Sequence, residues 1–268
     1  MNVIVITGAS EGIGAEMARQ WALRGGDGVA LVLAARHLDR LEAVATSCRA
    51  SGATVVVRRC DVGVQEDCIE LIAAAMHGFG RIDTLVNNAG VSAQALFADV
   101  SDLDWTERLM RVNHWGSVWC THAALQALKA SRGRIVAISS LAGLVGVPGR
   151  TAYCSSKFAM TGFFEALRVE LAVAGVSVTI AYPGVVATQI RHHGLNARGE
   201  TAGGSGLDER GAMSVKECAG LIVNGAEARQ RDIVMTAKGK FGRWLKLIAP
   251  GVVDRLALAA LKQEARPR

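Results

Sequence analysis

A tyrosine and a lysine four residues apart carry the strongest chemical signal in this sequence. Tyr153 and Lys157 project from one face if the chain from Ala152 onward is helical. A phenol titrates near pH ~10, so it is a poor base at neutral pH unless a positive charge lies beside it. An ammonium at ~4 Å and an effective dielectric of ~20 contributes about 4 kcal/mol, which lowers the pKa of the phenol by roughly three. The spacing therefore predicts a tyrosine that can give and take a proton.

A serine thirteen residues before the tyrosine completes this arrangement. Ser140 follows an apolar run that ends at Ile138, and we expect it to point toward the same pocket. Its hydroxyl can hold a substrate oxygen and stabilise the charge that develops there. Tyr153 then donates a proton to a carbonyl oxygen as hydride reaches the carbon, or removes it in the reverse direction. Singly, these residues have ordinary explanations: a turn serine, an amphipathic core tyrosine and a solvated lysine.

A glycine-rich turn follows the first apolar run of the chain. The segment 7–14 reads TGASEGIG, after a predicted strand and before a predicted helix. Gly8 permits the tight turn, Gly12 lets backbone approach a pyrophosphate, and Gly14 lets helix pack closely on strand. A tight turn without a ligand is the alternative. The pattern predicts a dinucleotide-binding loop made of Gly8, Ser10, Glu11, Gly12, Ile13 and Gly14.

The end of the second predicted strand indicates which dinucleotide binds. An NAD enzyme places an acidic residue there for the ribose hydroxyl, whereas a 2′-phosphate needs a cation. This sequence has Ala34, Ala35 and Arg36, and Arg36 can fork onto the phosphate with Ser10 nearby. Glu11 opposes this, and Arg36 alone also fits a solvated helix start. The sequence favours NADP(H) and leaves NAD(H) open.

Two further strand ends carry candidate nucleotide contacts. Asp61 can hydrogen-bond an adenine edge, and Val62 can pack against its face. The segment 87–90 (NNAG) closes the fourth predicted strand, where small residues admit the nucleotide and the two asparagines can tie strand ends together. NNAG alone could be a turn. These observations add Asp61, Val62, Asn88, Ala89 and Gly90 to the predicted cofactor site.

The elements that must position these residues alternate along the chain. Short apolar runs predict strands at 3–6, 29–33, 54–58, 82–86, 134–138, 177–181 and 233–236. Helical spacing predicts helices at 13–24, 38–50, 64–77, 104–131 with a break near Asn113, 152–174 and 214–227. Strands joined by crossover helices form a parallel sheet. We predict one doubly wound α/β domain over residues 1–237, with helices on both faces of the sheet. It includes a substrate loop at about 185–213. The polar, glycine-rich part of this loop, residues 191–212, is expected to be a lid or to be mobile.

Together these motifs resemble the short-chain dehydrogenase/reductase family, in the family's order from about residue 2 to 236. The resemblance rests on TGASEGIG, Asp61-Val62, NNAG, Asn113, the Ser140 to Tyr153-x-x-x-Lys157 spacing and residues 183–188 (PGVVAT). It implies the Rossmann fold and a water on Asn113 that links Lys157 to solvent. It implies nicotinamide contacts from Pro183, Gly184, Val186 and Thr188, with Tyr153 and Lys157 also touching the cofactor. A homodimer or homotetramer through helices 104–131 and 152–174 is a further implication.

The predicted activity is NADP(H)-dependent interconversion of a ketone and a secondary alcohol, with Tyr153 as general acid and base. The segments around Ser140 and Tyr153 are similar to a branch with hydroxysteroid and retinoid reductases. A catalytically inactive NADP-binding sensor or scaffold is the alternative, although it has no need of a tuned phenol. Sugar-nucleotide epimerisation is less favoured because no second domain holds the sugar. We expect a moderately hydrophobic substrate beside the 191–212 loop and Leu144, Val145, Val147 and Val185.

The positive charge of the chain lies at its C-terminal end. Residues 238–268 carry eight basic and two acidic side chains, which accounts for the net charge of +6 of the whole chain. This argues against a general nucleic-acid surface. Within this basic amphipathic extension, Phe241, Trp244 and Leu247 alternate with lysines and arginines until Pro250-Gly251 interrupts the run. Such a segment can cover the cleft or a subunit neighbour, or it can lie on an anionic membrane surface.

The remaining sequence features predict a cytoplasmic protein without metal. The chain begins Met1-Asn2 and enters an apolar run directly, without a basic leader or an 18-residue apolar span. Six scattered cysteines form no CxxC pair, so we expect neither disulfides nor a metal site. His192 and His193 are adjacent, and we expect both to be solvated.

Overall fold

A computed structural model describes residues 1–204 and 211–264, with side chains as far as Ala259. Its core is a parallel sheet of seven strands in the order β3-β2-β1-β4-β5-β6-β7. The strands before β4 are added on one side of β1 and the later strands on the other, so the strand order reverses between β1 and β4. This is the order of the doubly wound Rossmann fold that the sequence predicts. The strands are β1 Asn2–Thr7, β2 Val29–Ala35, β3 Thr54–Arg59, β4 Thr84–Asn87, β5 Arg134–Ile138, β6 Ser177–Tyr182 and β7 Asp232–Val234.

The central strands are apolar throughout because both of their faces are covered. In β1, Ile4 and Ile6 join the hydrophobic cluster on one face, whereas Val5 joins the cluster on the other. The register continues this alternation, with Ile4 opposite Leu31 and Val5 opposite Val32. A strand without a polar face must lie between two layers of helices.

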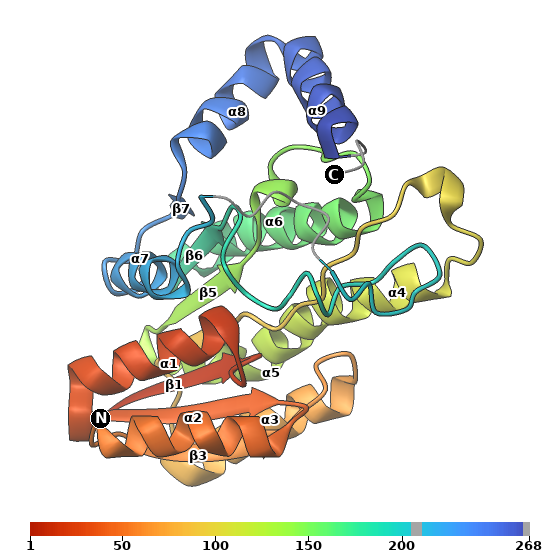
Figure 1. The fold of residues 1–268 in the computed structure, drawn as a ribbon. Coiled ribbons are helices and arrows are strands. Elements are labelled where there is room, and N and C mark those ends of the chain that lie inside the picture. The colour runs from red at the N-terminus through yellow and green to blue at the C-terminus, as the bar shows by residue number, and fades with distance from the viewer. Residues whose placement is uncertain (205–210, 265–268) are drawn as a thin grey trace.

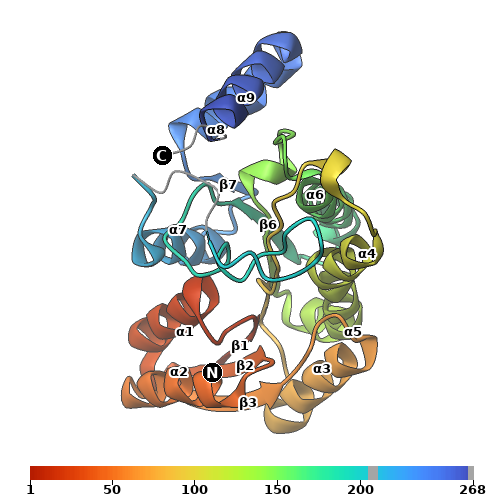
Figure 2. The same ribbon diagram turned by 45° about the vertical axis from the view of Figure 1, so that its right-hand side comes forward.

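Two layers of helices cover the sheet, and Figure 2 shows them on opposite sides. One layer contains α1 Gly12–Gly25, α2 Leu38–Ala50 and α7 Val215–Glu227. The other contains α3 Gln65–Phe79, α4 Asp104–Met110, α5 Gly116–Ser131 and α6 Thr151–Ala172. Both clusters are closely packed, with Trp21 buried in the first and Phe164 in the second. Every predicted strand and helix is confirmed, and only the boundaries differ.

Two boundary differences have a physical reason. Strand β4 begins at Thr84 rather than Ile82 because Asp83 leads into the sheet: its carboxylate accepts the backbone N–H of Val3 at 2.8 Å. The predicted break near Asn113 is a π-helical turn over residues 111–115 that joins α4 to α5 without interrupting the helix. A π turn inserts one residue into a helix and re-aims its neighbours, so it is often found at functional sites.

The substrate loop is only partly described. Between residues 189 and 204 it consists of turns, and Leu195 forms isolated bridges with Ala93 and Thr201. Val186 and Met213 pair at its base. Residues 205–210 of the predicted lid lie outside the described residues.

The C-terminal extension forms two helices, α8 Ala237–Ile248 and α9 Pro250–Glu264. The predicted interruption at Pro250 is therefore confirmed. Strand β7 ends at Val234 rather than Thr236 because Thr236 caps α8, its hydroxyl accepting the backbone N–H of Gly239 at 3.0 Å. In Figure 1, α8 and α9 stand away from the layered domain as a bent arm. Among the described residues, no helix combines the length and the apolarity needed to cross a lipid bilayer.

All six cysteines are free and buried. Cys48 and Cys218 lie in the cluster beneath α1, α2 and α7. Cys60, Cys68 and Cys120 lie in the cluster on the opposite face of the sheet. They serve as small core residues, as the sequence predicts.

Candidate active site

A cavity of about 590 Å³ opens at the carboxyl ends of the strands, where the sheet reverses its order. Of the predicted site residues, all but Gly14 and Asn113 line it. These are Gly8, Ser10, Glu11, Gly12, Ile13, Arg36, Asp61, Val62, Asn88, Ala89, Gly90, Ser140, Tyr153, Lys157, Pro183, Gly184, Val186 and Thr188. Segments separated by up to about 180 residues therefore form a single wall.

The glycine-rich loop is as tight as the sequence predicts. Gly8 and Gly12 adopt φ values of +64° and +57°, which side chains with a Cβ disfavour. A Cβ on Gly14 would overlap the carbonyl oxygen of Gly8 and would lie 2.5 Å from Nδ2 of Asn88. Gly14 is thus a packing residue behind the cavity rather than part of its wall. The loop leads directly into the N-terminus of α1, whose first N–H groups have no partner within the helix.

The ends of β1 and β4 are fixed to each other by hydrogen bonds. Nδ2 of Asn88 donates to the carbonyl oxygens of Thr7 and Gly8 at 2.9 and 3.0 Å. The hydroxyl of Thr7 accepts the backbone N–H groups of Asn88 and Ala89. The prediction that asparagines tie strand ends is confirmed for Asn88. It is wrong for Asn87, whose Nδ2 donates to Thr121 on α5.

Polar groups at the ends of β2 and β3 form one end of the cavity. Oδ1 of Asp61 accepts the backbone N–H of Gly63 at 2.9 Å, and this bond holds the carboxylate in place beside the buried Val62. Arg36 is exposed directly after β2. Arg40 also lines the cavity from the first turn of α2, four residues after Arg36. The short spacing between the two arginines is the sequence signal that identifies Arg40.

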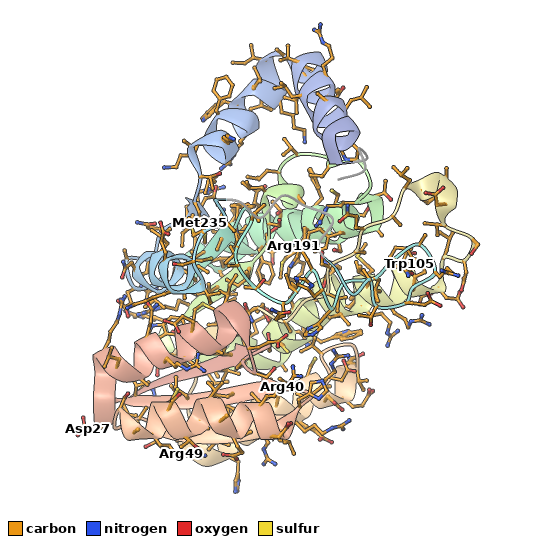
Figure 3. The ribbon with its side chains drawn as sticks, viewed as in Figure 1. Asp27, Arg40, Arg49, Trp105, Arg191 and Met235 are labelled. Atoms are coloured by element: carbon orange, nitrogen blue, oxygen red, sulfur yellow. The ribbon has the colours of Figure 1, made fainter. Side chains whose placement is uncertain are left out.

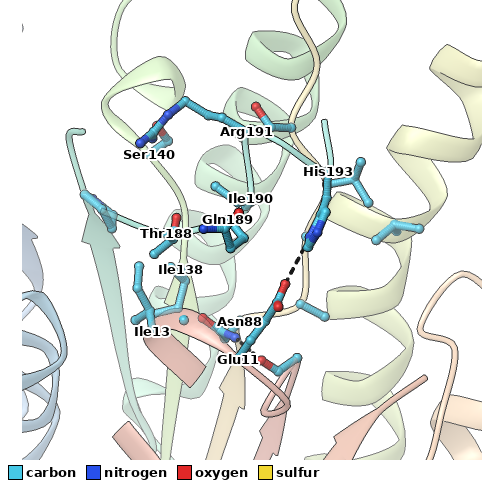
Figure 4. A pocket seen from close by; sticks show the side chains of 18 of the residues that line it. Glu11, Ile13, Asn88, Ile138, Ser140, Thr188, Gln189, Ile190, Arg191 and His193 are labelled. Atoms are coloured by element: carbon cyan, nitrogen blue, oxygen red, sulfur yellow. Dashed lines mark hydrogen bonds and ion pairs between the residues drawn. The ribbon is translucent and has the colours of Figure 1, made fainter. Parts of the chain in front are cut away.

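The carboxylate of Glu11 contacts two basic side chains, which the sequence does not reveal. Its carboxylate lies 3.1 Å from Nη1 of Arg40 and 3.3 Å from Nδ1 of His193. Figure 4 shows the second pair bridging the glycine-rich loop and the substrate loop. His193 is half exposed as expected, but it has a carboxylate partner. The positive charge of Arg40 offsets the negative charge of Glu11. Glu11 therefore does not make the surroundings of Arg36 negative.

Ser140, Tyr153 and Lys157 meet at the other end of the cavity. Ser140 follows β5, and its hydroxyl accepts the backbone N–H of Ala142 at 3.2 Å. Tyr153 and Lys157 lie one turn apart on α6 and are 8% and 3% exposed. Nζ of Lys157 donates to the carbonyl oxygen of Ile138 at 2.9 Å and lies 5.9 Å from the centre of the Tyr153 ring. The structure therefore places these three side chains on one wall of the cavity.

The pKa of Tyr153 departs from the prediction. Burial raises the pKa of this phenol, and the hydrogen bond from Ser140 and the charges of Arg150 and Arg191 only partly oppose that effect. Burial also lowers the pKa of Lys157 to about 8. Desolvation outweighs the nearby positive charges in this structure, so the pKa of the phenol is raised here. The predicted lowering also counts the charge of an oxidised nicotinamide, which would act in the opposite direction to burial.

Two buried arginines beside Tyr153 were not predicted. Nη2 of Arg191 donates to the carbonyl oxygen of Val186 at 2.8 Å. The guanidinium of Arg150 lies 5.9 Å from the Tyr153 ring centre and contacts Ser92 Oγ at 3.4 Å. Figure 3 shows Arg191 among the packed side chains at the centre of the molecule, and Figure 4 shows it extending toward Ser140. Both arginines line the cavity and are only 8% exposed.

Asn113 lies behind the cavity, within the π turn. Its Oδ1 accepts the backbone N–H of Val91 at 2.7 Å, and its Nδ2 donates to the carbonyl oxygen of Val91 and to Ser156 Oγ, both at 2.9 Å. Asn113 therefore fixes the chain after β4 to α6. A Cβ on Gly90 would lie 3.2 Å from Oδ1 of Asn113 and 3.6 Å from Nζ of Lys157. The missing side chain of Gly90 keeps that space open.

The segment after β6 closes the cavity. The carbonyl oxygen of Pro183 accepts the backbone N–H of Leu141 at 3.0 Å, which joins this segment to the turn after Ser140. Val186 is buried, and Thr188 faces the glycine-rich loop. Of the apolar residues expected around the substrate, Val147 and Val185 line the cavity, whereas Leu144 and Val145 stand outside its wall.

Comparison with known proteins agrees with this geometry. Residues 2–198 match the sequence profile of a family described as short chain dehydrogenase. The 11-beta-hydroxysteroid dehydrogenase-like 4A of Arabidopsis thaliana is 38% identical over 250 residues, which cover 93% of this chain and 81% of that protein. The 11-beta-hydroxysteroid dehydrogenase A of Arachis hypogaea is 37% identical over 260 residues, covering 94% and 73%.

A solved structure with the same fold has a nucleotide analogue bound. It is the alcohol dehydrogenase from the archaeon Thermococcus sibiricus complexed with 5-hydroxy-NADP. The two structures superpose with a TM-score of 0.75 and share 26% sequence identity, over 87% of this chain and 94% of the other.

Proposed function

Since the chain belongs to the short-chain dehydrogenase family, we propose that it is an NADP(H)-dependent oxidoreductase that interconverts a ketone and a secondary alcohol. The observation that carries this proposal is one cavity with a glycine-rich, arginine-flanked end and an end formed by Ser140, Tyr153 and Lys157. A dinucleotide spans such a cavity, so its reactive ring lies beside the proton donor.

The residues at the first end fit a dinucleotide. A Cβ on Gly8 would lie 2.8 Å from Cα of Ala89, so the loop is as close to the next strand end as backbone allows. The N-terminus of α1 offers N–H groups and the positive end of its dipole to a pyrophosphate. The N–H groups and side chains expected to hold the nucleotide come from Gly8 to Ile13, Asp61, Asn88 and Thr188.

The end of β2 supports a preference for NADP(H). Ala35 and Arg36 stand where an NAD enzyme needs a carboxylate, and Arg40 brings a second guanidinium to the same end. Glu11 holds Arg40 and is itself paired, so it does not repel a phosphate as an isolated carboxylate would. The NADP analogue in the related archaeal alcohol dehydrogenase is consistent with this preference.

Tyr153 is the proposed proton donor. Its raised pKa keeps the phenol protonated at neutral pH, which suits delivery of a proton to a carbonyl oxygen as the ketone is reduced. The hydroxyl of Ser140 holds the same oxygen and stabilises its developing negative charge. When bound, the nucleotide supplies the hydride in this direction and accepts it in reverse.

Lys157 is the proposed link between the phenol and solvent. It lies over the Tyr153 ring, and a pKa of about 8 lets it exchange a proton near neutral pH. The amide of Asn113 is engaged by Val91 and Ser156, so a relay water at this position would bind the backbone of the π turn. This refines the role that the family resemblance implies for Asn113.

The proposed substrate is a moderately hydrophobic ketone. The names of the plant relatives and the apolar wall at Val147 and Val185 support this class. Arg150 and Arg191 bring positive charge to the same region. A panel of steroid, aliphatic and aromatic ketones, each with and without a carboxylate, tests the class when NADPH oxidation is followed by absorbance.

Replacement of the phenol hydroxyl tests the mechanism. Tyr153→Phe is expected to abolish turnover while leaving the affinity for NADPH nearly unchanged. The second tyrosine of the chain is a matched control: Tyr182, the last residue of β6, is fully buried outside the cavity wall, and Tyr182→Phe should retain activity. Full activity in Tyr153→Phe would refute the mechanism. NADPH binding without turnover of any panel member by the unmodified chain would favour the inactive sensor or scaffold.

Arg36 tests the nucleotide preference separately. Arg36→Ala is expected to weaken NADPH binding by about 10- to 100-fold and to leave NADH binding nearly unchanged, because it removes a charge-assisted contact to the 2′-phosphate. Arg49 on the outer side of α2 is the control, since it contacts Glu42 and Val55 instead. Equal losses for NADPH and NADH would contradict the assignment of Arg36 to the phosphate.

A further inference from the structure

Helix α8 is amphipathic, and two of its four basic side chains, Arg243 and Lys246, face the protein. Nη1 of Arg243 lies 3.0 Å from Oδ2 of Asp232, at the start of β7. Nζ of Lys246 donates to the carbonyl oxygen of Leu144 at 3.0 Å and lies 4.6 Å from the centre of the Phe158 ring. These contacts fix the rotation of the helix about its axis.

The opposite side of α8 exposes large apolar side chains to solvent. Phe241, Trp244 and Ile248 follow the i, i+3, i+7 spacing of one helix face and are 66%, 65% and 81% exposed. Leu247 beside them is 72% exposed. We call these four residues the α8 apolar face. It lies on the arm that projects from the layered domain in Figure 1.

In this orientation α8 does not cover the cavity with its apolar face, as a lid would. A Cβ on Gly239 would overlap the side chain of Leu141, so the other side of α8 already packs on the segment after Ser140. To turn the apolar face toward the cavity, the ion pair of Arg243 and the hydrogen bond of Lys246 would have to break. Among the described residues, nothing covers the α8 apolar face.

Positive charge flanks this face. Lys240 precedes Trp244 by four residues and Lys238 precedes Phe241 by three, and both lysines are exposed. A two-fold association through this face would bring the lysines of both copies into one interface, where their positive charges add. An anionic lipid surface would instead attract them, while tryptophan and phenylalanine enter the headgroup region.

We propose that the α8 apolar face docks the protein on an anionic membrane surface. The four apolar side chains enter the interface, and Lys238 and Lys240 lie at the level of the lipid headgroups. This proposal goes beyond the catalytic function and does not depend on it, because binding is measured without turnover. No residue of the proposed active site belongs to the α8 apolar face.

Sedimentation of the full chain with lipid vesicles tests the proposal. We expect binding to vesicles of phosphatidylcholine mixed with phosphatidylserine, much weaker binding to phosphatidylcholine alone, and a loss of binding as salt is raised. The double variant Phe241→Ser, Trp244→Ser should bind at least about tenfold more weakly. Each of Lys238→Gln and Lys240→Gln should reduce binding about fivefold on the anionic vesicles only.

A matched variant separates this face from apolar exposure in general. Leu23 on α1 and Ile69 on α3 are 76% and 48% exposed and lie on helices of the layered domain, so Leu23→Ser with Ile69→Ser should bind like the unmodified chain. Far-UV circular dichroism verifies that each variant is folded. Equal binding of the Phe241, Trp244 variant and the unmodified chain would overturn the proposal. It would also be overturned if sedimentation velocity showed that these substitutions dissociate an oligomer while vesicle binding stays unchanged.

Discussion

Replacement of Lys157 by methionine is expected to change how the stability of the protein depends on pH. The lysine is 3% exposed, and burial lowers its pKa from 10.5 to about 8. That difference corresponds to about 3 kcal/mol, the free energy by which folding disfavours the charged form. Methionine has a similar length and takes no proton, so Lys157→Met removes this penalty.

The sign follows from the two pKa values. Below pH about 8 both states carry the proton, and the whole penalty reduces the free energy of unfolding of the unmodified protein. Between about 8 and 10.5 the folded state loses the proton first, so this group makes stability rise with pH. The advantage of Lys157→Met should therefore shrink by about 3 kcal/mol across that window. In Lys157→Met the carbonyl oxygen of Ile138 loses its donor, at a cost of about 1–3 kcal/mol. This cost shifts the difference in unfolding free energy between the two proteins by the same amount at every pH, so it does not change how that difference depends on pH.

Urea unfolding followed by tryptophan fluorescence at several pH values between 7 and about 11 measures this difference. Lys129→Met, on the exposed side of α5, controls for the loss of one lysine and its charge. A difference between Lys157→Met and the unmodified protein that stays constant across the window would refute the reasoning. The variant should also lose turnover, since the proposed relay needs the amine.

Two further predictions follow from the geometry of the cavity. Gly14→Ala should destabilise the fold by about 1–3 kcal/mol, because the added methyl group overlaps the carbonyl oxygen of Gly8. Thermal unfolding measures this loss of stability. Gly28→Ala is the control, since no atom lies near its added Cβ. Equal stability of the two variants would contradict the packing role. Arg191→Met should raise the pKa of Tyr153 further, because the guanidinium charge lowers it. The alkaline limb of the NADPH-dependent reduction rate should then move to higher pH, and an unchanged limb would exclude an electrostatic role for Arg191.

The fold could be predicted because its signals are local. Apolar runs without polar alternation, such as Val3 to Ile6, identify strands buried on both faces, and crossover helices leave only a parallel sheet. At Gly8 and Gly14 another part of the backbone lies too close to allow a side chain, and the spacing of glycines in residues 7–14 indicates this. The spacing of Tyr153 and Lys157 is set by one turn of helix. Each of these predictions depends on residues that are close together in the sequence.

The missed features depend on contacts between distant segments. Arg150 and Arg191 look like loop residues in the sequence, but the fold buries both. Arg150 contacts Ser92 and Gln94, which belong to the distant segment after β4. The pair between Glu11 and His193 joins residues about 180 positions apart. The pKa of Tyr153 depends on how completely the surrounding segments exclude water, which no residue spacing states. Assembly into dimers or tetramers stays a prediction.

The reactivity of the six buried cysteine thiols can report local unfolding of this protein. Burial raises the pKa of Cys48, Cys154 and Cys218, the last to about 12, so these groups remain uncharged and unreactive while the fold is closed. Cys218 lies on one side of the sheet and Cys68 on the other. An alkylating reagent therefore marks each position only when the layer around it separates from the strands. Mass spectrometry of the labelled peptides would then rank the two helical layers by the free energy needed to open them.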